Sequence, residues 1–289
     1  MSSVVPNIIL NNKLSIPQLG LGVWQANDGS EVEAAILSAI TAGYRLIDTA
    51  TAYGNEGGVG RAIKASGVPR EELFITTKLR NDSQGYDKTL AAFDESMKLL
   101  DLEYLDMYLI HWPQPSKGLY LETWKAMEEL HKQGRVKTLG VCNFQISHLQ
   151  NLMEHATVQP AVNQVELHPY FPQTELRKFA NDHNIAIESW SPIGGSGGAG
   201  GRSTHDSPLL DQPILLSIGQ QYGKTPAQVV LRWHIQNGLI VIPKSVHEDR
   251  IKQNIDVFDF ELTTDDMNSI NGLETGKRGG PDPDTFFSN

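Results

Sequence analysis

Short apolar runs and amphipathic stretches alternate along most of the chain. Tyr44 to Ile47 is an apolar run of the kind that forms a strand, and LFITTK from Leu73 is another. Between such runs, apolar residues recur at helical spacing, as in Lys88 to Leu100, where they share one face. This alternation predicts a parallel sheet whose strands are connected by helices.

We expect eight strands, each followed by a segment long enough for a helix. The expected strands end at Trp24, Asp48, Lys78, His111, Cys142, Gln164, Trp190 and Lys244. These ends lie 22 to 33 residues apart, apart from a last interval of 54. A βα unit needs roughly 30 residues. The spacing therefore predicts an α/β fold in a single domain, a (β/α)8 TIM barrel over residues 1–289.

Two segments fall outside the repeat. The run IILNNKLSIP turns at its two asparagines and predicts an N-terminal β-hairpin that caps one end of the barrel. The long interval between strands seven and eight holds the Gly-rich run IGGSGGAGGRSTHDSP and a helix from Ile214 to Tyr222. Gly195, Gly197 and Gly200 match G-x-G-x-x-G, but no helix opens directly after them. We expect an inserted loop over the active face rather than a Rossmann motif.

Helix ends are also visible in the sequence. Ser30 and Glu33 have the spacing of a capping box and predict a helix that starts there and ends near Gly43. Pro226 suits the first position of a helix that runs to Gln236. The C-terminal run GLETGKRGGPDPDTFFSN reads as an irregular tail that either folds over the site or stays mobile.

Composition narrows the function classes. The chain is 39% hydrophobic and 20% charged, as in ordinary globular proteins. Its net charge of -10 argues against nucleic acid or an anionic membrane as a partner. No apolar run approaches the roughly 20 residues that span a bilayer. A single cysteine, Cys142, and an N-terminus without signal-peptide character indicate a cytoplasmic protein.

Three of the expected strands end in titratable side chains. Asp48, Lys78 and His111 close strands two, three and four, and Tyr53 follows on the loop after Asp48. Active sites of α/β barrels form at the carboxyl ends of the strands, so these four side chains should share one pocket. Each alone has a structural explanation, such as a solvated lysine or a packed tyrosine. Together they indicate catalysis.

These residues and the motifs around them resemble the aldo-keto reductases, NADPH-dependent carbonyl reductases built on an eight-stranded barrel. The resemblance covers nearly the whole chain, through LGLGVW, GVCNF, NQVELHPY and IPKS in the family's order. ESWSPIGG and KTPAQVVLRWH are similar to the prokaryotic branch that includes 2,5-diketo-D-gluconate reductases. The resemblance implies that the chain reduces small aldehydes or ketones to alcohols by hydride transfer from NADPH.

The resemblance also assigns catalytic roles. Tyr53 would be the proton donor, and the nearby Lys78 ammonium would lower the pKa of its phenol below the usual value of about 10. Asp48 would hold Lys78 in place and charged. His111 would donate a hydrogen bond to the substrate carbonyl and orient it.

Residues after the last strand would bind the adenosine end of NADPH. Lys244, Ser245 and Arg250 suit its 2′-phosphate, because barrels commonly bind phosphate at their last loops and at a helix N-terminus. Asn254 lies four residues after Arg250 on the same helical face and would reach the adenine.

At the nicotinamide end, Trp190 would stack on the ring, although a tryptophan at a strand end is often simply core. Asn143 and Gln164 would form hydrogen bonds with the carboxamide. The complete cofactor-binding set implied by the resemblance is Val23, Asp48, Cys142, Asn143, Gln164, Trp190, Ser191, Ile193, Lys244, Ser245, Val246, Arg250 and Asn254.

Aromatic residues are the expected walls of the substrate pocket. Arg80 stands where many aldose reductases carry a tryptophan, which suggests a more polar pocket and contact with an anionic or polyhydroxylated substrate. An exposed surface arginine is the alternative. The predicted substrate-binding residues are Trp24, Arg80, His111, Trp112 and Phe286, with Phe287 beside the last.

Two positions depart from the family's pattern. His247 replaces a residue that is often Thr or Arg, which could soften the preference for NADPH over NADH. Cys142 replaces a usual Ser, and a thiol donates hydrogen bonds poorly. The carboxamide contacts would then fall to Asn143 and Gln164.

Two other functions remain open at this point. One is an NADPH-binding barrel of the same family that acts as a redox-sensing regulatory subunit with little turnover. The other is a metal-free barrel isomerase or hydrolase, which gives no role to Trp190 or Asn254. The sequence holds no His/Cys cluster with metal-ligand spacing, so we expect no metal. Family members are often monomers, although dimers occur.

Overall fold

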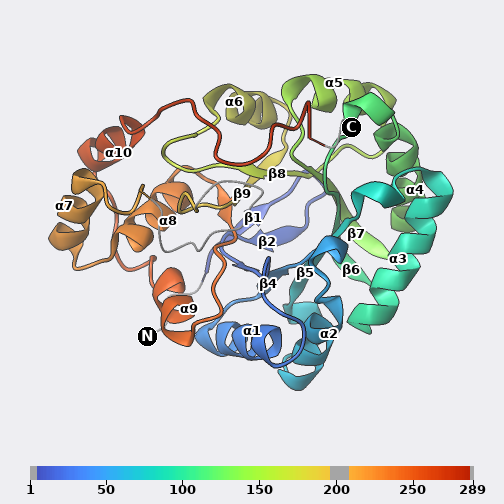
Figure 1. Cartoon of the computed structure of the whole chain (residues 1–289), viewed down its shortest axis with the longest axis horizontal. Helices are drawn as coiled ribbons and strands as arrows, with labels where there is room; N and C mark the ends of the chain where they lie inside the picture. Colours follow the sequence, from blue (N-terminus) through green and yellow to red (C-terminus); the bar gives the residue numbers. More distant parts are fainter. Residues whose placement is uncertain (1–4, 196–207, 287–289) are drawn as a thin grey trace.

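Eight parallel strands form the central sheet of the computed structural model, which describes residues 5–195 and 208–286. In spatial order they are β3 (Leu21–Gly22), β4 (Leu46–Asp48), β5 (Phe74–Leu79), β6 (Leu105–Ile110), β7 (Val136–Cys142), β8 (Val162–Glu166), β9 (Ala186–Trp190) and β10 (Ile240–Val241). Bridges from Leu19 to Val241 and from Gly22 to Lys244 join the first strand to the last. The sheet therefore closes into the predicted (β/α)8 barrel (Figure 1).

Helices surround the strands and cover the outside of the barrel (Figure 1). They are α1 (Ser30–Ala42), α2 (Glu56–Ala65), α3 (Tyr86–Leu100), α4 (Tyr120–Lys132), α5 (Ile146–His155), α6 (Thr174–Asp182), α7 (Pro213–Tyr222), α8 (Pro226–Gln236), α9 (Glu248–Ile255) and α10 (Thr264–Asn271). Short 3₁₀ turns are η1 (Thr51–Tyr53), η2 (Arg70–Glu72), η3 (Asn81–Ser83) and η4 (Pro115–Lys117). The inserted helix is present as α7, whereas most of the Gly-rich loop lies outside the described residues.

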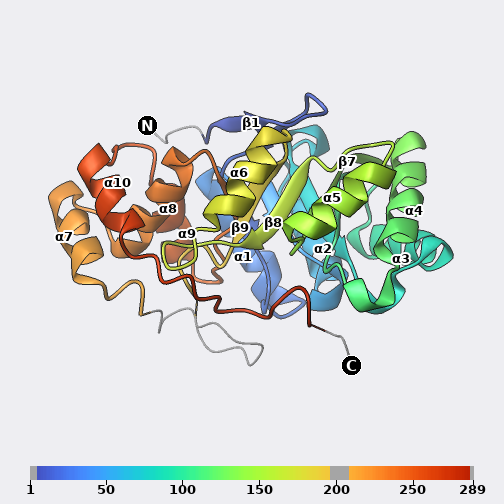
Figure 2. The same ribbon diagram turned by 90° about the horizontal axis from the view of Figure 1, so that it is seen from above.

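The N-terminal hairpin caps one end of the barrel. Strands β1 (Asn7–Ile9) and β2 (Ser15–Pro17) pair antiparallel, as predicted. Leu10 and Ile16 are buried against the apolar side chains inside the barrel. Figure 2 shows the hairpin on one side of the molecule and the C-terminal tail on the opposite side. The hairpin therefore does not cover the carboxyl ends of the strands, where the predicted site lies.

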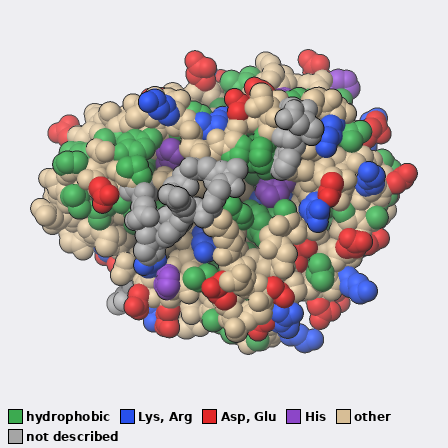
Figure 3. Space-filling model, in the orientation of Figure 1, with side chains coloured by type: hydrophobic (Ala, Val, Ile, Leu, Met, Phe, Trp, Pro, Cys, Tyr) green, Lys and Arg blue, Asp and Glu red, His purple; other side chains and the backbone are tan. Residues whose placement is uncertain are grey.

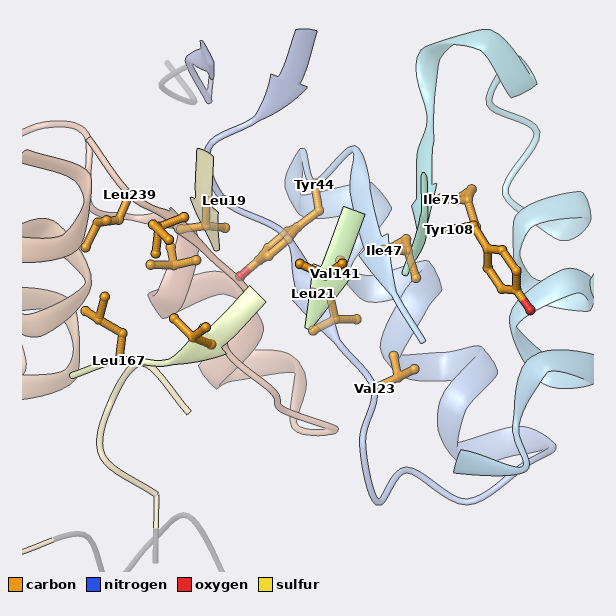
Figure 4. Packing of buried hydrophobic residues seen from close by; sticks show 14 of the residues in the cluster. Leu19, Leu21, Val23, Tyr44, Ile47, Ile75, Tyr108, Val141, Leu167 and Leu239 are labelled. Atoms are coloured by element: carbon orange, nitrogen blue, oxygen red, sulfur yellow. The ribbon is translucent and has the colours of Figure 1, made fainter. Parts of the chain in front are cut away.

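The core has two apolar parts, because side chains of a strand point alternately to its two faces. One part fills the barrel interior and includes Leu46, Phe74 and Met107. The other lies between strands and helices; Figure 4 shows Ile47 and Tyr108 among its side chains. This buried apolar surface fixes the positions of the strand ends.

Two details differ from the sequence prediction. The prediction of a capping box at Ser30 and Glu33 is wrong. Gly29, with φ of 91°, is the N-cap, and Ser30 is already helical. The Glu33 carboxylate instead accepts a hydrogen bond from Arg61 Nε at 2.7 Å, an interaction with the next helix that local spacing cannot reveal. Helix α10 was not predicted at all, although Thr263 and Asp266 form a capping box at its start.

Charged side chains of both signs are interspersed around the margin of the face in Figure 3. On that face, the described basic side chains do not gather into one large patch. None of the helices in residues 5–195 and 208–286 combines the length and apolar character needed to cross a membrane.

Gly60 provides a test of helix packing. A Cβ there would overlap the backbone carbonyl of Leu100, at the end of α3, which cannot move aside cheaply. We expect Gly60→Ala to lower the free energy of unfolding by about 1–3 kcal/mol, measured by urea denaturation. Gly57→Ala in the same helix is the control, because its Cβ would approach only the ends of side chains, those of Arg61 at 3.2 Å and Asp28 at 3.8 Å. An equal loss in both variants would contradict this account.

Candidate active site

The Lys78 ammonium is the centre of the site. It projects from β5 and is completely buried. Its Nζ donates to Asp48 Oδ1 at 2.5 Å, to the Thr49 carbonyl at 2.9 Å and to Tyr53 Oη at 3.2 Å. His111 follows β6, and its ring meets the Tyr53 ring edge-on at a centroid distance of 5.8 Å. The structure therefore brings the four predicted catalytic side chains together.

The surroundings determine the protonation of these groups. Burial alone would lower the pKa of Lys78, but the Asp48 carboxylate and the Tyr53 phenol raise it, so the ammonium stays charged. Burial raises the pKa of Tyr53 to about 12, and Lys78 offsets this only in part. The net shift is thus opposite to the predicted lowering. Burial and the Lys78 charge lower the pKa of His111 to about 3, which leaves a neutral imidazole at physiological pH.

The predicted nicotinamide-binding residues lie beside this group. Asn143 adopts a left-handed backbone with φ of 64° directly after β7. Its Nδ2 donates to the His111 carbonyl at 3.0 Å, and its Oδ1 accepts from Trp190 Nε1 at 2.9 Å. Gln164 lies inside the barrel next to Cys142, whose thiol is buried and has a raised pKa. Burial is the main cause, so Cys142 remains a neutral thiol.

Other predicted cofactor-binding residues follow the ends of barrel strands. The Val23 amide donates to the Asp48 carbonyl at 3.1 Å. Asn55, which sequence reasoning missed, donates through Nδ2 to the Val23 and Ala26 carbonyls, both at 3.0 Å. Ser191 follows β9 with φ of 48°, and Ile193 packs partly buried against the core.

The predicted phosphate-binding residues lie around the start of α9. The bridge to Gly22 places Lys244 at the rim of the barrel. Burial lowers the pKa of Lys244, opposed by attraction to Glu31. Ser245 Oγ accepts from the His247 amide at 3.1 Å and so shapes the turn into the helix. The same segment contains Val246, and the helix itself contains Arg250 and the buried Asn254.

The predicted substrate-binding residues differ in their exposure and in their contacts. Trp24 is 47% exposed. Trp112 is buried, and its ring lies 4.4 Å from that of Phe286 between centroids. Arg80 forms an ion pair with Asp82, with Nη2 and Oδ2 2.5 Å apart, and its side chain is 53% exposed. Phe287 lies outside the described residues.

Comparison with known proteins gives the family. The model of the aldo/keto reductase family matches residues 18–275. An aldo-keto reductase of Mycolicibacterium smegmatis is 54% identical over 281 residues, which cover 97% of this chain and 98% of the relative. The chain belongs to the aldo-keto reductase family.

Two further comparisons come closer to the chemistry of this aldo-keto reductase. Methylglyoxal reductase DkgA of Salmonella typhimurium is 52% identical over 282 residues, covering 97% of this chain and 98% of the relative. A crystal structure of a Gox0644 mutant in complex with NADPH matches with a TM-score of 0.89 and 46% identity, covering 97% and 98% of the two chains. The predicted class, an NADPH-dependent carbonyl oxidoreductase, is confirmed, and the redox-sensing alternative is not favoured.

The C-terminal tail of this reductase is held by Glu166, a residue to which the sequence analysis gave no role. The buried Glu166 carboxylate at the end of β8 accepts from the Gly279 amide at 2.6 Å and from the Gly280 amide at 2.9 Å. His168 Nε2 lies 3.0 Å from the same carboxylate. Gly280 packs so closely on Trp190 that a Cβ would come within 2.5 Å of the ring.

These contacts also govern how the tail responds to pH. Burial alone would raise the pKa of Glu166, but His168 and the two amides outweigh it and lower the pKa. Because the folded-state pKa is lowered, the carboxylate stabilises the folded tail above the ordinary pKa of a glutamic acid. That stabilisation is lost as the pH falls through the lowered value.

Removal of this carboxylate should release the tail. Hydrogen bonds to a charged group contribute about 1.5–3 kcal/mol, so we expect Glu166→Ala to speed tryptic cleavage after Arg278 at least tenfold. Cleavage after Lys117, on an exposed 3₁₀ turn, is the internal control and should not change. Equal cleavage after Arg278 in both proteins would show that Glu166 does not hold the tail.

Proposed function

We propose that Tyr53 donates the proton in the reduction of small aldehydes and ketones, with Lys78, Asp48 and His111 as its partners. The observation that carries this assignment is the geometry of the Lys78 ammonium, which contacts the Asp48 carboxylate and the Tyr53 hydroxyl at once. A charged ammonium beside a phenol favours the phenolate. It therefore stabilises the anion that remains after the proton has left.

The raised pKa of Tyr53 fits an acid that must hold its proton until the reaction. With a pKa of about 12, the phenol is protonated at physiological pH. An alkoxide that develops on the substrate is a much stronger base and takes the proton. The neutral His111 imidazole retains one N–H donor and is placed to orient the carbonyl oxygen against Tyr53.

The residues present fit NADPH, which supplies the hydride when bound. Trp190 offers an indole ring beside Asn143, and Gln164 Oε1 contacts only the weak thiol donor Cys142 among the described residues. Lys244 and Ser245, with Arg250 on α9, would hold the 2′-phosphate, and Asn254 on the same helix would reach the adenine beside Val246. Val23, Ser191 and Ile193 would line the nicotinamide side.

The substrate is proposed to be a small carbonyl compound of the methylglyoxal type. The 52% identity to methylglyoxal reductase DkgA supports this class. Trp24, Trp112 and Phe286 would form apolar walls around it. Arg80 would reach an anionic substrate only by leaving Asp82. We further propose that residues 1–289 form a single domain. We also propose that the protein is a monomer and is located in the cytoplasm.

Replacing the phenol tests the acid. Tyr53→Phe removes only the hydroxyl, so turnover of methylglyoxal with NADPH should fall by about 10²- to 10⁴-fold, the usual contribution of a general acid. The Kd for NADPH, measured by quenching of tryptophan fluorescence, should stay close to that of the wild type. Substantial residual turnover in a folded Tyr53→Phe protein would refute the assignment.

Lys244 provides the test of the phosphate site. A charge-assisted contact contributes about 1.5–3 kcal/mol, so Lys244→Ala should raise the Kd for NADPH by roughly 10- to 100-fold and leave that for NADH almost unchanged. Lys252→Ala is the matched control, since Lys252 lies on α9 but pairs with Glu248 at 2.5 Å. Equal effects of Lys244→Ala on both cofactors would contradict a 2′-phosphate contact.

A further inference from the structure

The amide of Gln164 is held between two carboxyl groups inside the barrel. Its Nε2 donates one hydrogen to Asp48 Oδ2 at 2.8 Å and the other to Glu188 Oε2 at 2.9 Å. Asp48 comes from β4, whereas Glu188 lies directly beside Gln164 on the neighbouring strand β9. Both N–H donors of the amide are therefore used.

This arrangement fixes which way the amide faces. A flipped amide would point its carbonyl oxygen at the Asp48 carboxylate, which only accepts hydrogen bonds, and would lose the bond to Oδ2. In the observed orientation, the contact of Gln164 Oε1 among the described residues is with Cys142 Sγ at 3.7 Å, and a thiol is a weak donor. Oε1 thus keeps the capacity to accept a strong hydrogen bond.

Glu188 is an unusual residue for the interior of a barrel. It is completely buried, its Oε1 has no hydrogen-bond partner in the described structure, and none of the described ion pairs includes it. Burial, with repulsion from Asp48, raises its pKa to about 8, so it is mostly neutral at pH 7. A methionine would fill similar space without desolvating a carboxyl group. Packing alone does not explain this residue.

We propose that Glu188 is a positioning residue that holds the Gln164 amide so that Oε1 accepts a hydrogen bond from the nicotinamide carboxamide N–H. The proposal rests on the proposed function, in which Gln164 contacts the nicotinamide. Asp48 alone can accept only one of the two N–H groups in this geometry. Without Glu188 the second N–H would be unsatisfied, and one hydrogen bond in place of two would hold the amide.

A pair of substitutions separates positioning from packing. Glu188→Met removes the acceptor and keeps the approximate length, whereas Glu188→Gln keeps an acceptor oxygen. The probes are NADP⁺ and its 3-acetylpyridine analogue, in which a methyl group replaces the carboxamide NH₂. Their Kd values come from quenching of tryptophan fluorescence, and the midpoint of thermal unfolding reports on stability.

We expect the wild type to bind NADP⁺ about tenfold more tightly than the analogue, because only NADP⁺ offers the N–H donor. Glu188→Met should abolish this difference, and Glu188→Gln should restore most of it. Gln164→Ala should also abolish it, with no further loss when combined with Glu188→Met. A purely structural role would instead lower the unfolding midpoint of Glu188→Met and leave the preference intact.

The outcomes also distinguish failure of this inference from failure of the proposed function. If the wild type bound neither probe, the proposed cofactor site itself would be wrong. If it bound both with equal affinity, the inference alone would be overturned, even if Glu188→Met failed to fold. A preference for NADP⁺ that persisted in folded Glu188→Met would overturn it as well.

Discussion

The ion pair of Lys78 and Asp48 is the interaction on which the site depends. A buried ammonium is costly unless its charge and its N–H donors are satisfied. Here Asp48, the Thr49 carbonyl and Tyr53 satisfy the three donors. These contacts hold the loop after β4 in place and also keep the lysine charged. Any change that displaced Tyr53 would also leave an ammonium hydrogen unsatisfied, so stability and geometry are coupled at this point.

The barrel interior is divided along its axis into an apolar and a polar part. Inward-facing residues recur every second position along a strand. On β4 this takes the interior from Leu46 to Asp48, and on β8 from Val162 to Gln164. The apolar part is sealed by the hairpin, and the polar part lies toward the carboxyl ends of the strands. Charged groups are thereby concentrated where the substrate carbonyl would enter.

The sequence was sufficient for the barrel and for the four clustered side chains, because strand ends of a parallel barrel necessarily meet at one rim. It could not supply properties that depend on distant partners. The pKa of Tyr53 follows from enclosure by the whole fold, and Arg80 is occupied by Asp82 on the same exposed turn. Glu166 and Glu188 stand within strand patterns, and the sequence predicted no role for either side chain. Glu166 acquires its role from tail amides more than 110 residues away, with which no local spacing connects it.

Gly280 divides the C-terminal tail into two parts that differ in how freely their amino-acid sequence can change. Its backbone lies against both the Glu166 carboxylate and the Trp190 ring, and no side chain fits between them. A side chain at this position would displace the Trp190 ring as well as the tail. Beyond it, the chain leads to Phe286 at Trp112. Substitutions in the distal tail would therefore change the surroundings of Trp112 while Gly280 leaves the Trp190 indole undisturbed.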